Sequence, residues 1–169
     1  RAFLLRAYPL QTHEMLFDAH NHAFRVLGGV PQRGIFDNMK TAVDKIKKGK
    51  ARDVNMRFQV MVNHFVFEAE FCNPASGWEK GQIEKNVQDS RHRLWQVAPV
   101  FENLDALNAW LERRCIELWS ELRHPQRREF TIRELWEQER GTLMAAPSAF
   151  DGFVEHTKRV SPTCLVHFD

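Results

Sequence analysis

The chain has 169 residues, of which 43% are hydrophobic and 27% are charged, so we expect a globular domain with a real core. No apolar run approaches the roughly 20 residues of a membrane span, which argues against a membrane protein. The three cysteines, Cys72, Cys115 and Cys164, are far apart and form no CxxC pair, so we expect reduced thiols rather than a zinc ribbon or a disulfide framework.

The net charge of +2 is unevenly distributed along the chain. Residues 1–100 contain 15 Lys and Arg against 10 Asp and Glu, whereas residues 101–169 contain 9 against 12. A basic first part favours an anionic partner.

The first forty residues are predicted to alternate strand, helix and strand. The apolar run 2–9 ends at Pro9 and predicts a buried strand. Thr12 is placed to cap a helix, which Gly28 and Gly29 would end. The stretch "RGIFDN" (33–38) predicts a second strand, and this rhythm is typical of an α/β sheet.

The next sixty residues are predicted to continue this alternation. Residues 40–52 contain six basic residues and one acid, which indicates a polar, mobile segment. Apolar spacing predicts a helix over 54–65, and alternation predicts a strand over 65–72 with one wet face. After a loop at 73–77, a helix is predicted from about residue 78 to 95.

The last seventy residues are predicted to be mostly helical. A leucine stripe predicts a helix over 103–122. Thr131 and Glu134 form a capping box for a further helix that should reach about Leu143. The stretch "AAPSAFDGF" (145–153) is interpreted as a linker, and "TCLVHFD" (163–169) as a strand.

The fragment "DAHNHAF" suggests a metal site or an HNH nuclease signature through Asp18, His20 and His22. On a helix, however, residues two apart point about 200° away from each other. Because the periodicity of this segment is helical, we expect surface histidines here and no shared metal.

Asp37 and Glu84 together suggest metal chemistry. Each alone is ordinary, since Asp-Asn is common in turns and a helical Glu usually faces solvent. Phosphodiester chemistry with two Mg²⁺ ions needs several carboxylates that converge on metals about 4 Å apart. A strand end can supply one carboxylate and a neighbouring helix another. The lysines at 45–50 are either a solvated loop or, beside such a site, a phosphate clamp.

The stretches "GGVPQRGIFDNMKTAV" (28–43) and "KGQIEKNV" (80–87), in this order of elements, carry a family resemblance. The chain resembles the RNase H-like catalytic core of retroviral-type integrases and transposases. Its motif sequences are most similar to those of IstA-type bacterial insertion-sequence transposases. The resemblance implies an α/β fold in which residues 1–98 are a partial catalytic core lacking its first strands. Residues 99–146 would be a helical extension, and residues 147–169 a linker and the first strand of a C-terminal β-barrel.

The resemblance also implies roles for individual residues. Asp37 matches the second catalytic aspartate of the family and Glu84 matches its catalytic glutamate, both as ligands of two Mg²⁺ ions, with Mn²⁺ as an alternative. The first aspartate is expected upstream of residue 1, so the chain by itself should be inactive. Without the first strands, the sheet would leave an apolar face and an open edge, so we also expect poor solubility. We expect nine polar side chains to contact DNA: Lys40, Lys45, Lys47, Lys48, Lys50, Lys80, Lys85, Gln88 and Arg91.

The implied function is a DDE-type DNA transposase that cuts and joins 3′ ends in the parent protein. Its implied partners are double-stranded DNA (transposon ends and target), an ATPase helper protein of the IstB type and further copies of itself on DNA. The implied location is the bacterial cytoplasm, associated with the nucleoid. Two alternatives stay open: a non-catalytic DNA-binding remnant of a transposase, and a helical interaction module built on the stripe at 104–122.

Overall fold

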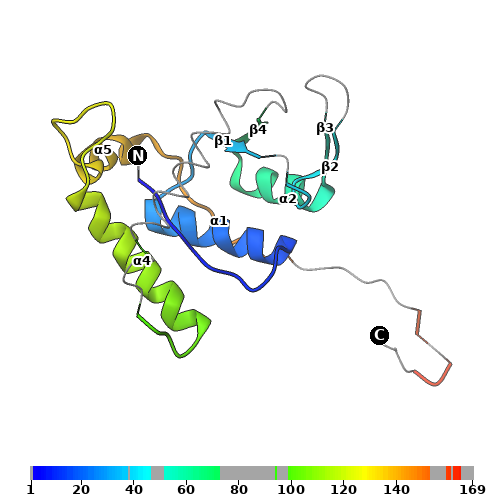
Figure 1. The fold of residues 1–169 in the computed structure, drawn as a ribbon. Coiled ribbons are helices and arrows are strands. Elements are labelled where there is room, and N and C mark those ends of the chain that lie inside the picture. Colours follow the sequence, from blue (N-terminus) through cyan, green and yellow to red (C-terminus); the bar gives the residue numbers. More distant parts are fainter. Residues whose placement is uncertain are drawn as a thin grey trace.

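The fold was obtained as a computed structural model, which describes residues 2–37, 39–46, 52–72, 94, 99–152, 159–160 and 162–164. The predicted α/β class is confirmed within this part of the chain (Figure 1). The elements there are α1 (His13–Leu27), β1 (Arg33–Phe36), β2 (Val43–Ile46), β3 (Arg52–Val54), α2 (Met56–Phe65), β4 (Glu68–Phe71), α4 (Leu104–Glu121), α5 (Ile132–Glu139) and the 3₁₀ turn η1 (Arg140–Thr142).

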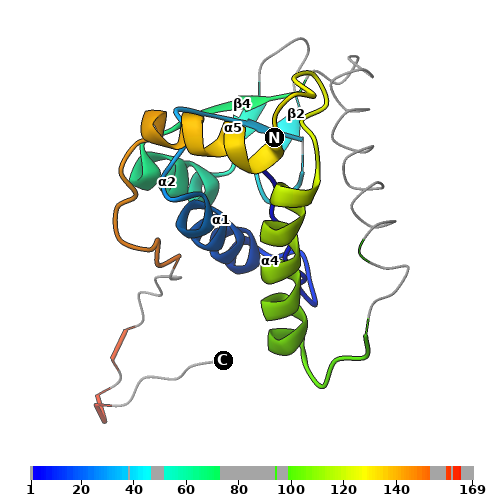
Figure 2. The ribbon, with the colours of Figure 1, turned by 90° about the vertical axis from the view of Figure 1, so that its left-hand side faces the viewer.

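Strands β1 and β4 pair in parallel, and α1 and α2 lie on one side of this pair (Figure 2). The register places Arg33 beside Glu68 and Phe36 beside Phe71. Successive side chains of a strand point to opposite faces, so Phe36 and Phe71 face the helices while Arg33 and Glu70 face solvent. The Arg33 Nη1 to Glu70 Oε1 distance is 3.3 Å.

Helix α1 begins and ends where the sequence predicted. The Thr12 hydroxyl accepts a hydrogen bond from the Met15 amide at 3.4 Å, which satisfies a free N–H of the first turn. Gly28 ends the helix with φ of +77°, a left-handed conformation that glycine adopts without a steric penalty.

The main core is aromatic and lies between α1, α2 and the β1–β4 pair. Six buried phenylalanines dominate it: Phe17, Phe24, Phe36, Phe58, Phe65 and Phe67. Burial of rings of this size is the largest source of stability for a domain of this length.

The strand predicted over residues 2–9 is wrong. These residues form no strand, and they run instead along α4, where Phe3, Leu4 and Leu5 pack against a second cluster of buried side chains. The buried Asn108 side chain replaces a neighbouring strand, because it accepts from the Ala7 amide at 2.7 Å and donates to the Ala7 carbonyl at 3.0 Å. The backbone N–H and C=O of Ala7 are thus satisfied by a side chain rather than by a sheet.

The polar, mobile segment predicted at 40–52 is wrong in its described part, because β2 and β3 form an antiparallel pair there. Ala42 and Val43 are buried in the aromatic core, which holds the start of this hairpin against the domain. The predicted helix at 54 begins at Met56, since Asn55 caps it through its side chain. The predicted strand at 65 begins at Glu68, since Phe65 still belongs to α2.

The C-terminal helices follow the prediction closely. Asn103 caps α4, and the predicted capping box of Thr131 and Glu134 opens α5. Helix α5 ends at Glu139, and η1 covers the residues predicted to continue it. The predicted helix at 78–95 lies outside the described residues apart from the helical, buried Leu94, and the predicted strand at 163–169 lies almost wholly outside them. No helix in the described ranges combines the length and apolar character needed to cross a membrane.

Candidate functional site

The carboxyl ends of β1 and β4 meet at one edge of the sheet because the two strands are parallel. Asp37 directly follows β1, and Cys72 directly follows β4. The Cys72 amide donates to the Phe36 carbonyl at 2.9 Å, so the two strand ends remain paired up to Asp37. Residues 73–93, which include Glu84, therefore follow a strand that ends at the same edge as Asp37.

Asp37 is exposed and opens a tight turn. Its carbonyl accepts from the Met39 amide at 2.8 Å, and the Met39 carbonyl accepts from Ala42 and Val43 at 2.9 and 3.0 Å. This turn leads directly into β2. It places the exposed Lys40 three residues from Asp37, and Lys45 follows within β2. One carboxylate and the first of the predicted DNA-binding lysines thus share a short, hydrogen-bonded stretch.

Phe36 anchors this strand end in the core. Its side chain is only 9% exposed, and its ring centroid lies 4.9 Å from Phe58, 5.6 Å from His20 and 5.8 Å from Phe67. Since Phe36 is the residue before Asp37, these contacts fix the backbone from which the carboxylate projects.

His20 is half-buried and its ring lies against Phe24, Phe36 and Phe67 of the aromatic core, so the prediction of a surface histidine is wrong at this position. Its ring is parallel to Phe67 within 2° and lies edge-on to Phe24 at 5.7 Å. Its Nδ1 lies 2.8 Å from the Leu16 carbonyl oxygen and must donate to it, which leaves the neutral ring with Nε2 unprotonated. Burial among apolar rings lowers the pKa of His20 below its ordinary value.

This environment predicts a pH-dependent stability. Unfolded His20 binds a proton near pH 6.5, whereas the folded protein takes it up only at lower pH. The unfolded state therefore binds more protons in that window, and the free energy of unfolding should fall as the pH is lowered from 7.5 to 5. Urea denaturation across this range should show a smaller fall for His20→Phe, which keeps an aromatic ring. An equal fall in both proteins would contradict this assignment.

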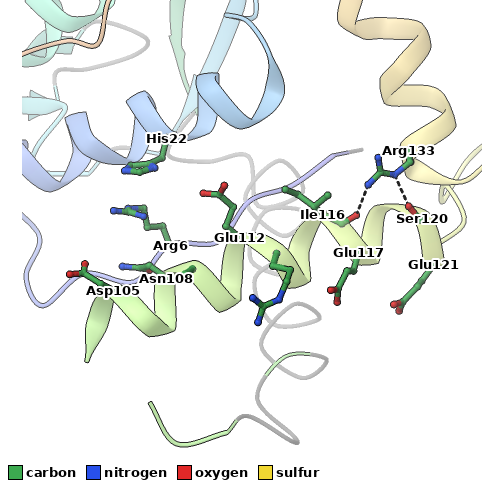
Figure 3. A pocket seen from close by; sticks show the side chains of 12 residues that line it. Arg6, His22, Asp105, Asn108, Glu112, Ile116, Glu117, Ser120, Glu121 and Arg133 are labelled. Atoms are coloured by element: carbon green, nitrogen blue, oxygen red, sulfur yellow. Dashed lines mark hydrogen bonds between the residues drawn. The ribbon is translucent and has the colours of Figure 1, made fainter. Parts of the chain in front are cut away.

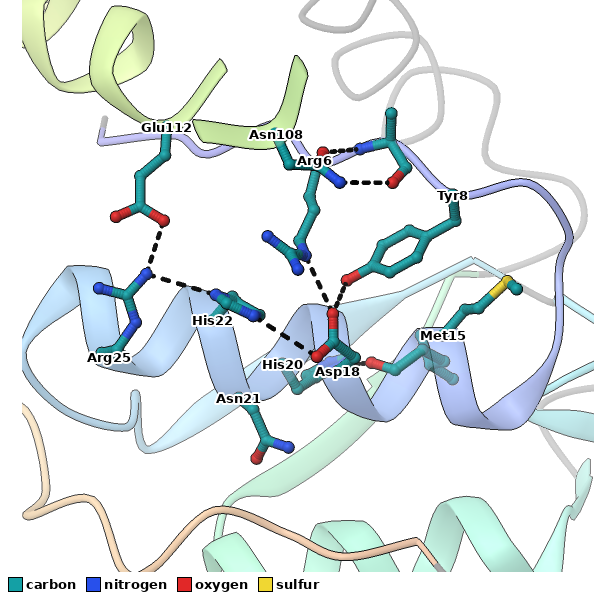
Figure 4. Close-up of polar contacts among 12 residues, drawn as sticks. Arg6, Tyr8, Met15, Asp18, His20, Asn21, His22, Arg25, Asn108 and Glu112 are labelled. Carbon is teal, nitrogen blue, oxygen red and sulfur yellow. Dashed lines mark hydrogen bonds and ion pairs between the residues drawn. The ribbon is translucent and has the colours of Figure 1, made fainter. Parts of the chain in front are cut away.

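Asp18 ties the N-terminal segment to α1 and takes no part in the strand edge (Figure 4). Its carboxylate accepts from Tyr8 Oη at 2.6 Å and from Arg6 Nε at 2.9 Å, and it lies 3.4 Å from His22 Nε2. Burial by itself would raise the pKa of Asp18, but the hydrogen bonds from Tyr8 and Arg6 outweigh it and lower that pKa. As predicted from helical geometry, His20 and His22 lie on different sides of α1.

A cavity of about 810 Å³ lies along α4, near Arg6, His22 and Arg133 (Figure 3). Arg133 donates to Ser120 Oγ at 2.6 Å and to the Ile116 carbonyl at 3.3 Å. The lining holds three arginines but also four acids, which makes it unsuited to a DNA phosphate backbone. The seven are Arg6, Arg113, Arg133, Asp105, Glu112, Glu117 and Glu121.

The described residues bring together Asp37, Lys40 and the start of the β2–β3 hairpin. Glu84 and the other predicted DNA contacts fall outside them: Lys47, Lys48, Lys50, Lys80, Lys85, Gln88 and Arg91. Within the described ranges, no group of three His, Cys, Asp or Glu side chains could hold a metal ion. Sequence reasoning missed His20 and Asn108, although the four-residue spacing of Leu16, His20 and Phe24 placed His20 on an apolar helix face.

Known proteins similar to this chain are insertion-sequence transposases. A transposase of Aminobacter aminovorans is 66% identical over all 169 residues, and so is a transposase for insertion sequences IS1326/IS1353 of Pseudomonas aeruginosa. The transposase for insertion sequence element IS21 of Pseudomonas aeruginosa is 30% identical over 112 residues, 66% of the chain and 28% of that protein. No family model matches the chain.

The chain belongs to the insertion-sequence transposases. The chain spans 33% of the length of the two relatives that match all of its residues. The predicted resemblance to insertion-sequence transposases is thereby confirmed. In this transposase segment, Asp37 is the exposed carboxylate at the edge where β1 and β4 both end.

Proposed function

We propose that the parent protein is a DNA transposase that cuts DNA at the ends of an insertion sequence and joins the freed 3′ ends to a target. One observation carries this proposal: Asp37 projects exposed from the edge where β1 and β4 both end, and the segment with Glu84 departs from that same edge. This placement is compatible with an RNase H-like core, in which carboxylates converge at strand ends. The transposase relatives support the same reading.

Asp37 fits a Mg²⁺ site by its chemistry. Mg²⁺ prefers hard oxygen ligands and keeps part of its water shell, so an exposed carboxylate on a fixed backbone is a suitable ligand. We propose Asp37 and Glu84 as two ligands of a two-ion site that also accepts Mn²⁺. When bound, such ions would activate the attacking oxygen and stabilise the leaving oxygen.

The chain's own residues would then orient the reacting DNA. In cleavage a water oxygen bonds to the phosphorus while the bond to the 3′ oxygen breaks, which frees a 3′-hydroxyl. In joining, that 3′-hydroxyl oxygen bonds to a phosphorus of the target strand while the bond from this phosphorus to the target's own 3′ oxygen breaks, which leaves a 3′-hydroxyl on the target. Neither step needs a covalent enzyme intermediate. Phe36 would keep the Asp37 backbone in place, and Lys40 and the following lysines would hold the phosphates near it.

The two rival interpretations are distinguishable. A purely helical interaction module does not fit the strands β1 to β4. A DNA-binding remnant would share the basic segment and would bind DNA without metal-dependent joining. We further propose an ATPase helper of the IstB type and multimers on paired DNA ends as partners of the parent protein, testable by co-purification with DNA ends present.

The lysines that follow Asp37 give a quantitative test of DNA contact. Replacing Lys45, Lys47, Lys48 and Lys50 together by Gln in the parent protein should reduce the slope of log affinity against log salt by roughly 3 to 4. Fluorescence anisotropy with duplex DNA from 50 to 200 mM salt measures this slope. The matched control replaces Arg113, Arg123, Arg127 and Arg128 by Gln and should leave the slope almost unchanged. Equal slopes in all three proteins would remove the lysines from the interface.

A further inference from the structure

Residues 148–152 lie extended against α1 and α2, as the orange segment in Figures 1 and 4 shows. The stretch predicted as a linker is therefore docked against the two helices in its described part. The backbone groups of a free linker would form hydrogen bonds with water. In this segment, several of them form hydrogen bonds with side chains of the two helices instead.

Three helical side chains bind alternate carbonyls of the segment. His64 Nε2 lies 2.8 Å from the Ser148 oxygen, Asn21 Nδ2 donates to the Phe150 oxygen at 3.0 Å, and Arg57 Nη2 donates to the Gly152 oxygen at 2.8 Å. The Phe150 amide completes the Asn21 contact by donating to Asn21 Oδ1 at 2.8 Å. This pattern resembles the capture of an extended peptide, in which backbone bonds supply affinity and alternate side chains supply specificity.

Asn21 leaves α1 on the side away from Asp18 and points toward the segment (Figure 4). One helix therefore serves two attachments, with Asp18 holding the N-terminal residues and Asn21 holding residues near the C-terminal end.

Phe150 is the anchor side chain of the segment. Its ring lies edge-on to Phe17 at 5.0 Å and also contacts His64 at 5.2 Å and Phe65 at 6.4 Å. Gly152 then crosses Phe17 so closely that a Cβ atom there would lie 2.1 Å from Phe17 Cδ2. The surface of α1 and α2 thus accommodates a large aromatic side chain and, two positions later, a residue without a Cβ atom.

The segment is docked independently of the structure that precedes it. Met144 pairs with Val30 through two backbone hydrogen bonds of 2.8 and 2.9 Å, and residues 145–147 between the two attachments are exposed. Contacts of Phe150 and Gly152 thus add a second, separate attachment to the domain.

We infer that α1 and α2 form a peptide-binding groove whose occupant is this chain's own segment 148–152. The docked segment holds residues up to Gly152 at a fixed place on the α1–α2 surface. The groove does not depend on the chemistry proposed for the strand edge with Asp37.

Amide hydrogen exchange of the parent protein tests this groove directly. In the unmodified protein the Phe150 amide should exchange slowly, and Asn21→Ala should speed its exchange at least about tenfold, because both the acceptor and the docked conformation are lost. Gly152→Ala should act similarly through the clash with Phe17. Ser148→Ala is the matched control, since only the carbonyl of that residue is bound.

The amides of α4, such as that of Leu118, report whether a variant is still folded and should stay protected throughout. A Phe150 amide that exchanges at the rate of a free peptide in the unmodified protein would overturn the inference. So would unchanged Phe150 protection in both Asn21→Ala and Gly152→Ala. These measurements do not involve DNA joining, so their failure is separable from a failure of the proposed function.

Discussion

Replacing Asp37 by Asn in the parent protein is expected to reduce strand transfer by at least about 100-fold while DNA binding persists. The amide keeps the size of the carboxylate but removes the negative charge that would hold a metal ion. Glu84→Gln should have the same effect for the same reason. Gel separation of joined from unjoined labelled DNA measures transfer, and anisotropy measures binding.

Asp105→Asn is the matched control for this loss of charge. Asp105 is exposed in the first turn of α4, whose start lies far from β1 and β4 (Figures 1 and 2), and its replacement should leave transfer within about twofold of the unmodified protein. Joining by Asp37→Asn at the unmodified rate would contradict the proposed role of the strand edge. Loss of DNA binding together with joining would instead point to a general folding defect.

The second large effect is expected at Phe58. Its side chain is fully buried, and its ring lies 4.9 Å from Phe36 and 5.8 Å from Phe71. Phe58→Ala should lower the free energy of unfolding by about 3–5 kcal/mol, because burial is lost and a cavity is left. Urea denaturation followed by circular dichroism measures the change, which should appear as a lower midpoint with a similar slope.

Met56 offers a control on the same helix. It is 79% exposed, so Met56→Ala should change the free energy of unfolding by no more than about 0.5 kcal/mol. Similar losses in the two variants would mean that α2 is not packed through its Phe58 face. Phe58 contacts the ring of Phe36, the residue before Asp37. Loss of the Phe58 ring should therefore also disturb the strand edge.

The sequence by itself determined those helices and strands that depend on interactions between residues close together in the chain. Thr12 and Thr131 each supply a capping oxygen to a helix start, so α1 and α5 could be predicted near their true first residues, and the leucine stripe predicted α4. The apolar stretch before Asp37 determined β1 in the same way. The position of Asp37 at a strand end follows from this, and the exposure of its side chain agrees with it.

Tertiary partners decided the remaining features. Residues 2–8 have the composition of a strand, but Asn108 binds the backbone of Ala7 and Trp119 binds the carbonyl of Phe3, each from more than a hundred residues away. Residues 148–152 look like a linker, but Asn21 and Arg57 bind their carbonyls. Periodicity and capping act between residues a few positions apart and are legible in the sequence, whereas a backbone group's partner across the fold becomes defined only when the chain has packed.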